Sequence, residues 1–167
     1  MNIENLVSEL ERQKETNIDL VVDSRTLSAV SDYGGSIKIQ IPDYASYELT
    51  QYAHNQMADK LGIPRKYYDR MLVAGKSELL AANVNAWIGE KEKRLVRIQD
   101  GVIRAILSDR YKVMDNYDLV FLALEEFKKK ETVRILKATV TETMLYIKAV
   151  DTTLLAEIRV GDNVQGA

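Results

Sequence analysis

The dipeptide Asp100-Gly101 constrains the fold of this 167-residue chain more than any other feature. It stands between two segments, 94–99 and 102–108, in which apolar and polar residues alternate. Asp-Gly is strongly favoured in the two-residue type I′ turn, because both positions of that turn require a positive φ. The sequence therefore predicts a β-hairpin centred on this turn.

The turn also fixes the register of the hairpin, and counting outward from it places Arg97 directly opposite Arg104. Like charges at opposed positions destabilise a sheet by up to about 1 kcal/mol, so something should offset this pair. One explanation is solvent together with a neighbouring Asp or Glu, and the other is a phosphate of a nucleic-acid strand. We therefore treat the basic residues of this region as candidate nucleic-acid-binding residues. They are Arg94, Arg97, Arg104, Arg110 and Lys112.

The remaining periodicity predicts an α+β fold. Helices are expected over 3–14, 46–61, 64–73, 77–88 and 116–130, and further strands over 19–22, 36–41, 132–140 and 143–150. Ser46 is the expected N-cap of the first helix of the middle segment. The architecture is then a helical half (about 46–88) packed with antiparallel hairpins that flank a helix (about 94–150).

No long linker or internal repeat divides the sequence, so we expect one domain over 1–167. The last residues, AEIRVGDNVQGA, resemble the entry to another strand rather than the end of a domain. We therefore expect a chain that is truncated at its C-terminus.

The amino-acid composition excludes several kinds of functional site. The chain has no cysteine and a single histidine, His54, which excludes disulfides, cysteine-ligated zinc and multi-histidine metal sites. It has no apolar run of the roughly 18 residues that a membrane helix needs, and its acidic N-terminus is not a signal peptide. We expect a cytoplasmic, non-catalytic protein without a cofactor or bound metal. The net charge of −2 is unlike that of a dedicated DNA-binding domain, although a local basic patch is compatible with it.

The polar loop after the hairpin has two interpretations. Asp109 is expected to pair locally, Asp115 or Asn116 to cap the next helix, and Asp118 to lie in its first turn. The alternative is a divalent-cation site made of Asp109, Asp115 and Asp118. The spacing of these carboxylates matches no known cation-binding motif.

Residues 49–72 have the outline of a helix-turn-helix, with a glycine at the turn and Arg65, Lys66, Tyr67 and Arg70 on the second helix. The same pattern describes any pair of helices with a glycine stop, and the acidic balance of the chain favours that reading. We expect His54 at a helix surface or at the edge of the core.

Three segments in this order resemble the phage/plasmid-like proteins of the family "domain of unknown function 932": LGIPRKYYDRML, AANVNAWIGE and RLVRIQDGVIRAILSDRYKVMDNYDLV. The resemblance covers about residues 45–165. It implies a bacteriophage, plasmid or prophage setting and supplies no catalytic residues. The family-typical positions of its most distinctive segment are Ser108, Asp109, Arg110, Tyr111, Asp115, Asn116 and Tyr117.

Together these observations lead us to expect a mobile-element protein that associates with nucleic acid, as a single-strand binder or recombination accessory. One alternative is an interaction or assembly module that acts on a phage or host protein or on a second copy of itself. The other is a carboxylate-based, metal-dependent enzyme.

Overall fold

The computed structural model describes residues 3–32, 34–90, 93–141, 143–159 and 162–166, and its fold is α+β, as the sequence predicts. The chain divides into two compact units. The central unit is Thr16–Lys112, and the terminal unit combines Met1–Glu15 with Val113–Ala167. Each is described by itself below. The expectation of a single domain over 1–167 stays a prediction.

The central unit is built on a six-stranded sheet with the strand order β1-β5-β6-β4-β3-β2. Its strands are β1 (Ile18–Asp23), β2 (Ser28–Ser31), β3 (Ile37–Gln40), β4 (Ser46–Leu49), β5 (Lys93–Gln99) and β6 (Val102–Ser108). The sheet is mixed, because β4 pairs in parallel with β6 while the other neighbours are antiparallel.

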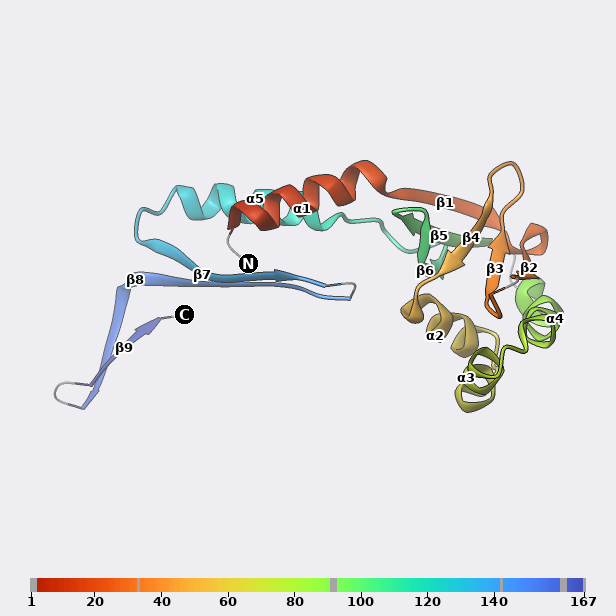
Figure 1. Ribbon diagram of the computed structural model, residues 1–167. Coiled ribbons are helices and arrows are strands. Elements are labelled where there is room, and N and C mark those ends of the chain that lie inside the picture. The colour runs from red at the N-terminus through yellow and green to blue at the C-terminus, as the bar shows by residue number, and fades with distance from the viewer. Residues whose placement is uncertain (1–2, 33, 91–92, 142, 160–161, 167) are drawn as a thin grey trace. The chain divides into compact units, whose positions relative to one another are not determined.

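Three helices lie against one face of this sheet (Figure 1). They are α2 (Gln51–Lys60), α3 (Arg65–Val73) and α4 (Ser77–Trp87), and the short 3₁₀ turns η1 (Ser24–Thr26) and η2 (Ile88–Glu90) complete the unit. The core lies between sheet and helices, where Ile39, Ile98 and Ile103 are buried together with Met57 and Leu80. Each such side chain stabilises the fold by about 1.5–3 kcal/mol relative to leaving it exposed.

The prediction that a helix begins at Ser46 is wrong. Residues 46–49 form β4, and α2 begins only after Thr50, whose Oγ1 accepts a hydrogen bond of 3.2 Å from the Ala53 N–H. Strand β2 was likewise not predicted. Both are four-residue strands that gain their stability from pairing with β3, which a local sequence pattern does not reveal. The strand predicted over 143–150 begins at Leu145 and extends to Arg159, and the other predicted helices and strands lie within a few residues of their expected positions.

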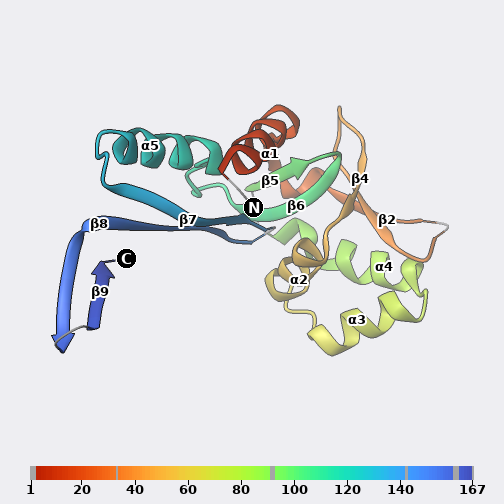
Figure 2. The same ribbon diagram turned by 60° about the vertical axis from the view of Figure 1, so that its left-hand side comes forward.

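The terminal unit is a three-stranded antiparallel sheet with two helices on one face (Figure 2). Its elements are α1 (Ile3–Thr16), α5 (Asn116–Lys128), β7 (Val133–Val140), β8 (Leu145–Arg159) and β9 (Asp162–Gly166). Leu6 and Leu10 of α1 pack with Val120 of α5 and Ala138 of β7 in a small apolar core. Across the described residues of both units, no helix is long and apolar enough to cross a membrane.

Candidate nucleic-acid interface

The predicted hairpin forms, but its register differs beyond the first two residue pairs. Asp100 and Gly101 have φ values of 53° and 74°, as a type I′ turn requires. Gln99 then lies opposite Val102, as predicted, but a β-bulge follows and places Arg97 opposite Ala105. The prediction that Arg97 faces Arg104 is therefore wrong. A bulge sets two residues of one strand against one of its partner, so Arg104 occupies the extra position.

Arg97 is neutralised inside the fold by Asp19, its partner on the neighbouring strand β1. The Arg97 Nε donates to Asp19 Oδ1 at 2.7 Å, and Nη2 donates to Oδ2 at 3.1 Å. The two side chains are only 14% and 24% exposed. This bidentate ion pair matches the first explanation offered by the sequence, in which a neighbouring carboxylate offsets the arginine charge.

The same sheet face carries further internal partners for its charges. Arg104 donates from Nη1 to Gln99 Oε1 at 2.9 Å. Lys38 of β3 lies 3.1 Å from Asp32 and 3.5 Å from Glu48 of β4, and the hydrogen bond to Asp32 raises the pKa of this lysine. These contacts leave little unbalanced positive charge on this face of the sheet.

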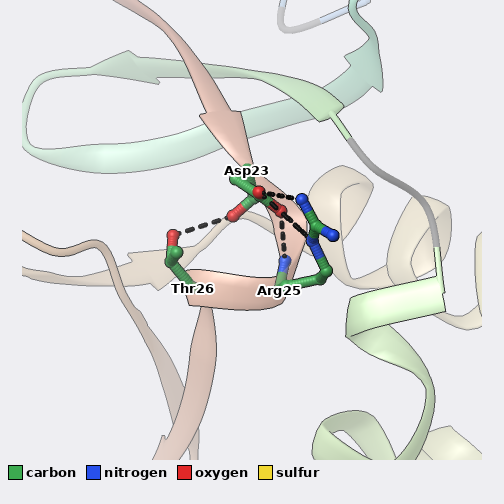
Figure 3. A network of polar contacts seen from close by, with 3 residues as sticks. All are labelled: Asp23, Arg25 and Thr26. Atoms are coloured by element: carbon green, nitrogen blue, oxygen red, sulfur yellow. Dashed lines mark hydrogen bonds and ion pairs between the residues drawn. The ribbon is translucent and has the colours of Figure 1, made fainter.

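The positive charge at the start of β5 also has a carboxylate opposite it. Lys93 lies opposite Asp23, whose carboxylate accepts hydrogen bonds from the backbone and guanidinium of Arg25 (Figure 3). These hydrogen bonds hold the pKa of Asp23 at about 2. Arg94 differs, because burial and, to a smaller extent, the charge of Arg94 lower the pKa of Lys60 on α2. Arg94 and Lys60 therefore bring two positive charges near each other in the central unit.

The family-typical positions divide between the two units. In the central unit, Ser108 donates to Asp109 at 3.3 Å and accepts from the Arg110 N–H at 3.3 Å, which forms a local turn. Arg110 and Lys112, like Tyr111, are exposed. In the terminal unit, Asp115 occupies the N-cap position of α5, whose first residue is Asn116.

Tyr117 and Asp118 make contacts that support α1 and α5. The Tyr117 ring stacks on Phe121 with centroids 6.0 Å apart, and the Lys14 ammonium lies 4.5 Å from the Tyr117 centroid. Asp118 accepts a hydrogen bond of 3.0 Å from Lys14, which raises the pKa of that lysine. In the part of the chain that the structure describes, no three His, Asp or Glu side chains are grouped so as to hold a metal ion.

The structure brings together a basic pair that the sequence analysis missed. Lys137 of β7 lies directly opposite Lys148 of β8, and the neighbouring pair on the same face is Thr139 with Tyr146. Both lysines are exposed, and Tyr146 is 43% exposed. The opposite face, with Ala138 and Ile147, packs in the core with α1 and α5. Among the described side chains, neither lysine forms an ion pair.

We call these four residues, Lys137, Thr139, Tyr146 and Lys148, the lysine ribbon. The register of the ribbon is set by the turn, where Thr141 and Met144 exchange hydrogen bonds of 2.8 and 3.0 Å. Val140 pairs with Leu145 next to this turn, and Lys137–Lys148 is the third residue pair beyond them. The turn contains no Asn-Gly or Asp-Gly dipeptide, so the sequence predicted the strands but not their register.

The helix pair α2–α3 is an αα-hairpin with Gly62 in the left-handed conformation (φ 65°) at its turn. Residue His54 is buried, rather than at the core edge, and its Nδ1 lies 2.9 Å from the Tyr68 hydroxyl. Burial lowers the pKa of His54 and raises that of Tyr68. Both side chains thus serve the packing of α2 against α3.

Comparisons of the chain with protein-family models, with curated proteins and with solved structures find no match. The family resemblance therefore stays a prediction from the sequence motifs, and the functional argument rests on the geometry described above.

Proposed function

We propose that the protein binds single-stranded nucleic acid and that the lysine ribbon holds the strand. The observation that carries this proposal is the pair Lys137–Lys148, which is exposed, directly opposed and without an ion pair among the described residues. Like charges at directly opposed positions of an antiparallel pair destabilise the sheet. Phosphates of a bound strand remove this repulsion when each ammonium group donates a charge-assisted hydrogen bond to one of them.

Tyr146 makes a single strand the favoured form of the ligand. Its pair, Thr139–Tyr146, is the next pair on the same face as the two lysines, and Tyr146 is 43% exposed. Stacking of an unpaired base on an exposed aromatic ring contributes about 1–3 kcal/mol, whereas the bases of a duplex are already stacked on one another. Lysines that contact phosphates beside an aromatic ring that stacks a base are the usual combination in single-strand binding.

The overall charge of the chain sets the expected character of the binding. With a net charge of −2, the protein as a whole does not attract nucleic acid, so the affinity depends on local contacts. We expect modest affinity with a shallow dependence on salt, because two lysines release few counterions.

The setting is part of the same proposal. The three sequence segments that resemble the phage/plasmid-like family support a role in a mobile element, as a single-strand binder or recombination accessory. A cytoplasmic location is supported by the absence of cysteine from the sequence.

Fluorescence anisotropy with labelled single-stranded and double-stranded oligonucleotides tests the proposal. At low salt we expect binding that favours the single strand and that Lys137→Gln/Lys148→Gln weakens. The matched control is Lys128→Gln/Lys130→Gln, which removes the same charge from exposed lysines of the same unit. No binding to the single strand at low salt, or equal weakening by both double variants, would contradict the proposal.

Assembly with a second copy or another protein is a second candidate function, favoured by the outer surface of α5. Leu119 and Leu122 are three residues apart on this helix and are 43% and 61% exposed, and Phe121 between them is 49% exposed. Adjacent exposed apolar side chains of this kind mark interaction surfaces. Light scattering over a range of concentrations should show a dimer that Leu119→Gln/Leu122→Gln dissociates. A monomer at every concentration would contradict self-assembly.

A further inference from the structure

The only tryptophan of the chain, Trp87, lines a hollow on the helical side of the central unit. The hollow has a volume of about 400 Å³ and lies between α3 and α4, which run side by side (Figure 2). Trp87 is 49% exposed and Tyr67, on the other helix, is 43% exposed. Leu61, Ile63 and Pro64 contribute apolar surface to the same hollow.

The two aromatic side chains are placed by the local structure of the helix ends. Pro64 starts α3, which sets Tyr67 in the first turn of that helix, while Trp87 is the last residue of α4. Among the described residues, the Tyr67 and Trp87 rings do not contact each other. Both side chains line the hollow and are partly exposed, so both are accessible to an aromatic ligand bound there.

A polar group with a fixed orientation completes the hollow. Asn83 lies one helical turn before Trp87, and its Nδ2 donates to the Leu79 carbonyl at 2.7 Å. This hydrogen bond directs the amide, and the Asn83 Oδ1 accepts no hydrogen bond from a residue that the structure describes. The hollow therefore offers an acceptor for an N–H group of a ligand.

Two cationic side chains of α3, outside the lining of the hollow but on the same helix as Tyr67, favour an anionic ligand. Lys66 precedes Tyr67, and Arg70 lies one turn further along α3. Both are exposed, and neither forms an ion pair among the described side chains. An aromatic hollow can also bind a proline-rich peptide, but such a peptide would leave these cations unused. A ligand with a planar ring, N–H donors and a phosphate matches the aromatic side chains, the Asn83 acceptor and the two cations.

We propose that this hollow binds the base of a nucleotide, stacked on Trp87 and Tyr67. An N–H on the edge of the base donates to Asn83 Oδ1, and Lys66 and Arg70 attract its phosphate. The inference goes beyond the proposed function, since it uses other residues in the other unit and stands or falls independently of the lysine ribbon.

Because Trp87 is the only tryptophan, its fluorescence reports on the hollow directly. We expect titration of the full chain with adenosine monophosphate to quench this fluorescence in a saturable manner. Tyr67→Ala should weaken binding by about fivefold or more, the equivalent of one lost stacking contact, and Tyr67→Phe should keep the affinity. The matched control is Tyr44→Ala, which removes another exposed tyrosine of the central unit and should have no effect.

The outcomes separate this inference from the function proposed above. Lys137→Gln/Lys148→Gln should leave the quenching by the mononucleotide unchanged, whatever it does to oligonucleotide binding. Absence of saturable quenching, or equal quenching in the folded Tyr67→Ala variant, would overturn the inference. Saturable quenching by a proline-rich peptide and not by the mononucleotide would also overturn it, in favour of a peptide site.

Discussion

The ion pair between Asp19 and Arg97 provides a quantitative test of the corrected hairpin register. Its two hydrogen bonds of 2.7 and 3.1 Å and its exposures of 14% and 24% place it between two measured classes. Exposed pairs contribute about 0.2–1 kcal/mol, and breaking a fully buried pair costs about 3–5 kcal/mol. We therefore expect Asp19→Ala to lower the free energy of unfolding by about 2 kcal/mol.

The double-mutant cycle isolates the interaction itself. Removing one partner takes the opposite charge away from a largely buried ionic side chain, so Asp19→Ala/Arg97→Ala should be no less stable than either single variant. The expected coupling energy is about 1–2 kcal/mol. For a unit of about 100 residues, a loss of 2 kcal/mol corresponds to a decrease in Tm of about 8–16 °C.

Urea unfolding followed by Trp87 fluorescence is the appropriate assay, because this residue lies in the same unit as the ion pair. The closest control is Asp23→Ala/Arg25→Ala, whose ion pair is short, at 2.6 Å, but exposed. Its coupling should be much smaller. A cycle for Asp19 and Arg97 with coupling below about 0.5 kcal/mol would refute the reasoning. If the folded Arg97→Ala variant instead binds oligonucleotides more weakly, Arg97 contributes to nucleic-acid binding.

Three further predictions concern stability. Burial lowers the pKa of His54 below 6.5, so the unfolded chain takes up a proton at higher pH than the folded chain. Stability should therefore fall as the pH decreases below about 6.5 towards the folded-state pKa, and His54→Gln should flatten this dependence in thermal unfolding between about pH 7 and pH 5.5. Thr50→Ala should cost about 1 kcal/mol in urea unfolding through loss of the α2 cap, whereas Ser46→Ala should cost less than about 0.5 kcal/mol. Gly101→Ala should cost about 1–2 kcal/mol by the same measurement, because the turn needs a φ of 74° there, and an unchanged midpoint would argue against the type I′ turn.

The features that the sequence predicted are those with a strong local signal. Asp100-Gly101 specifies its turn through backbone conformation alone, and the periodic helices specify their own apolar faces. The bulge beside Arg97 has no such signal, because no glycine marks it, and the partner carboxylate of Arg97 lies on β1, a strand far away in the sequence.

The candidate site was missed for a related reason. The strands that carry Lys137 and Lys148 were predicted, but their register depends on a turn closed by Thr141 and Met144, whose side-chain and backbone hydrogen bonds are not evident from residue types. The hollow at Trp87 requires α3 and α4 to lie side by side, a tertiary contact. Local patterns therefore predicted most of the elements, apart from β2 and β4, whereas the proposed binding sites depend on how distant segments pair.

The dependence of oligonucleotide affinity on salt tests the lysine ribbon most directly. For single strands, the slope of log K against log salt concentration is about −0.7 for each phosphate neutralised. If Lys137 and Lys148 each neutralise one phosphate, Lys137→Gln/Lys148→Gln should make the slope shallower by about 1.4, and Lys128→Gln/Lys130→Gln should leave it nearly unchanged. An unchanged slope in the ribbon variant, or the same change in the control, would contradict the assignment of the strand to this surface.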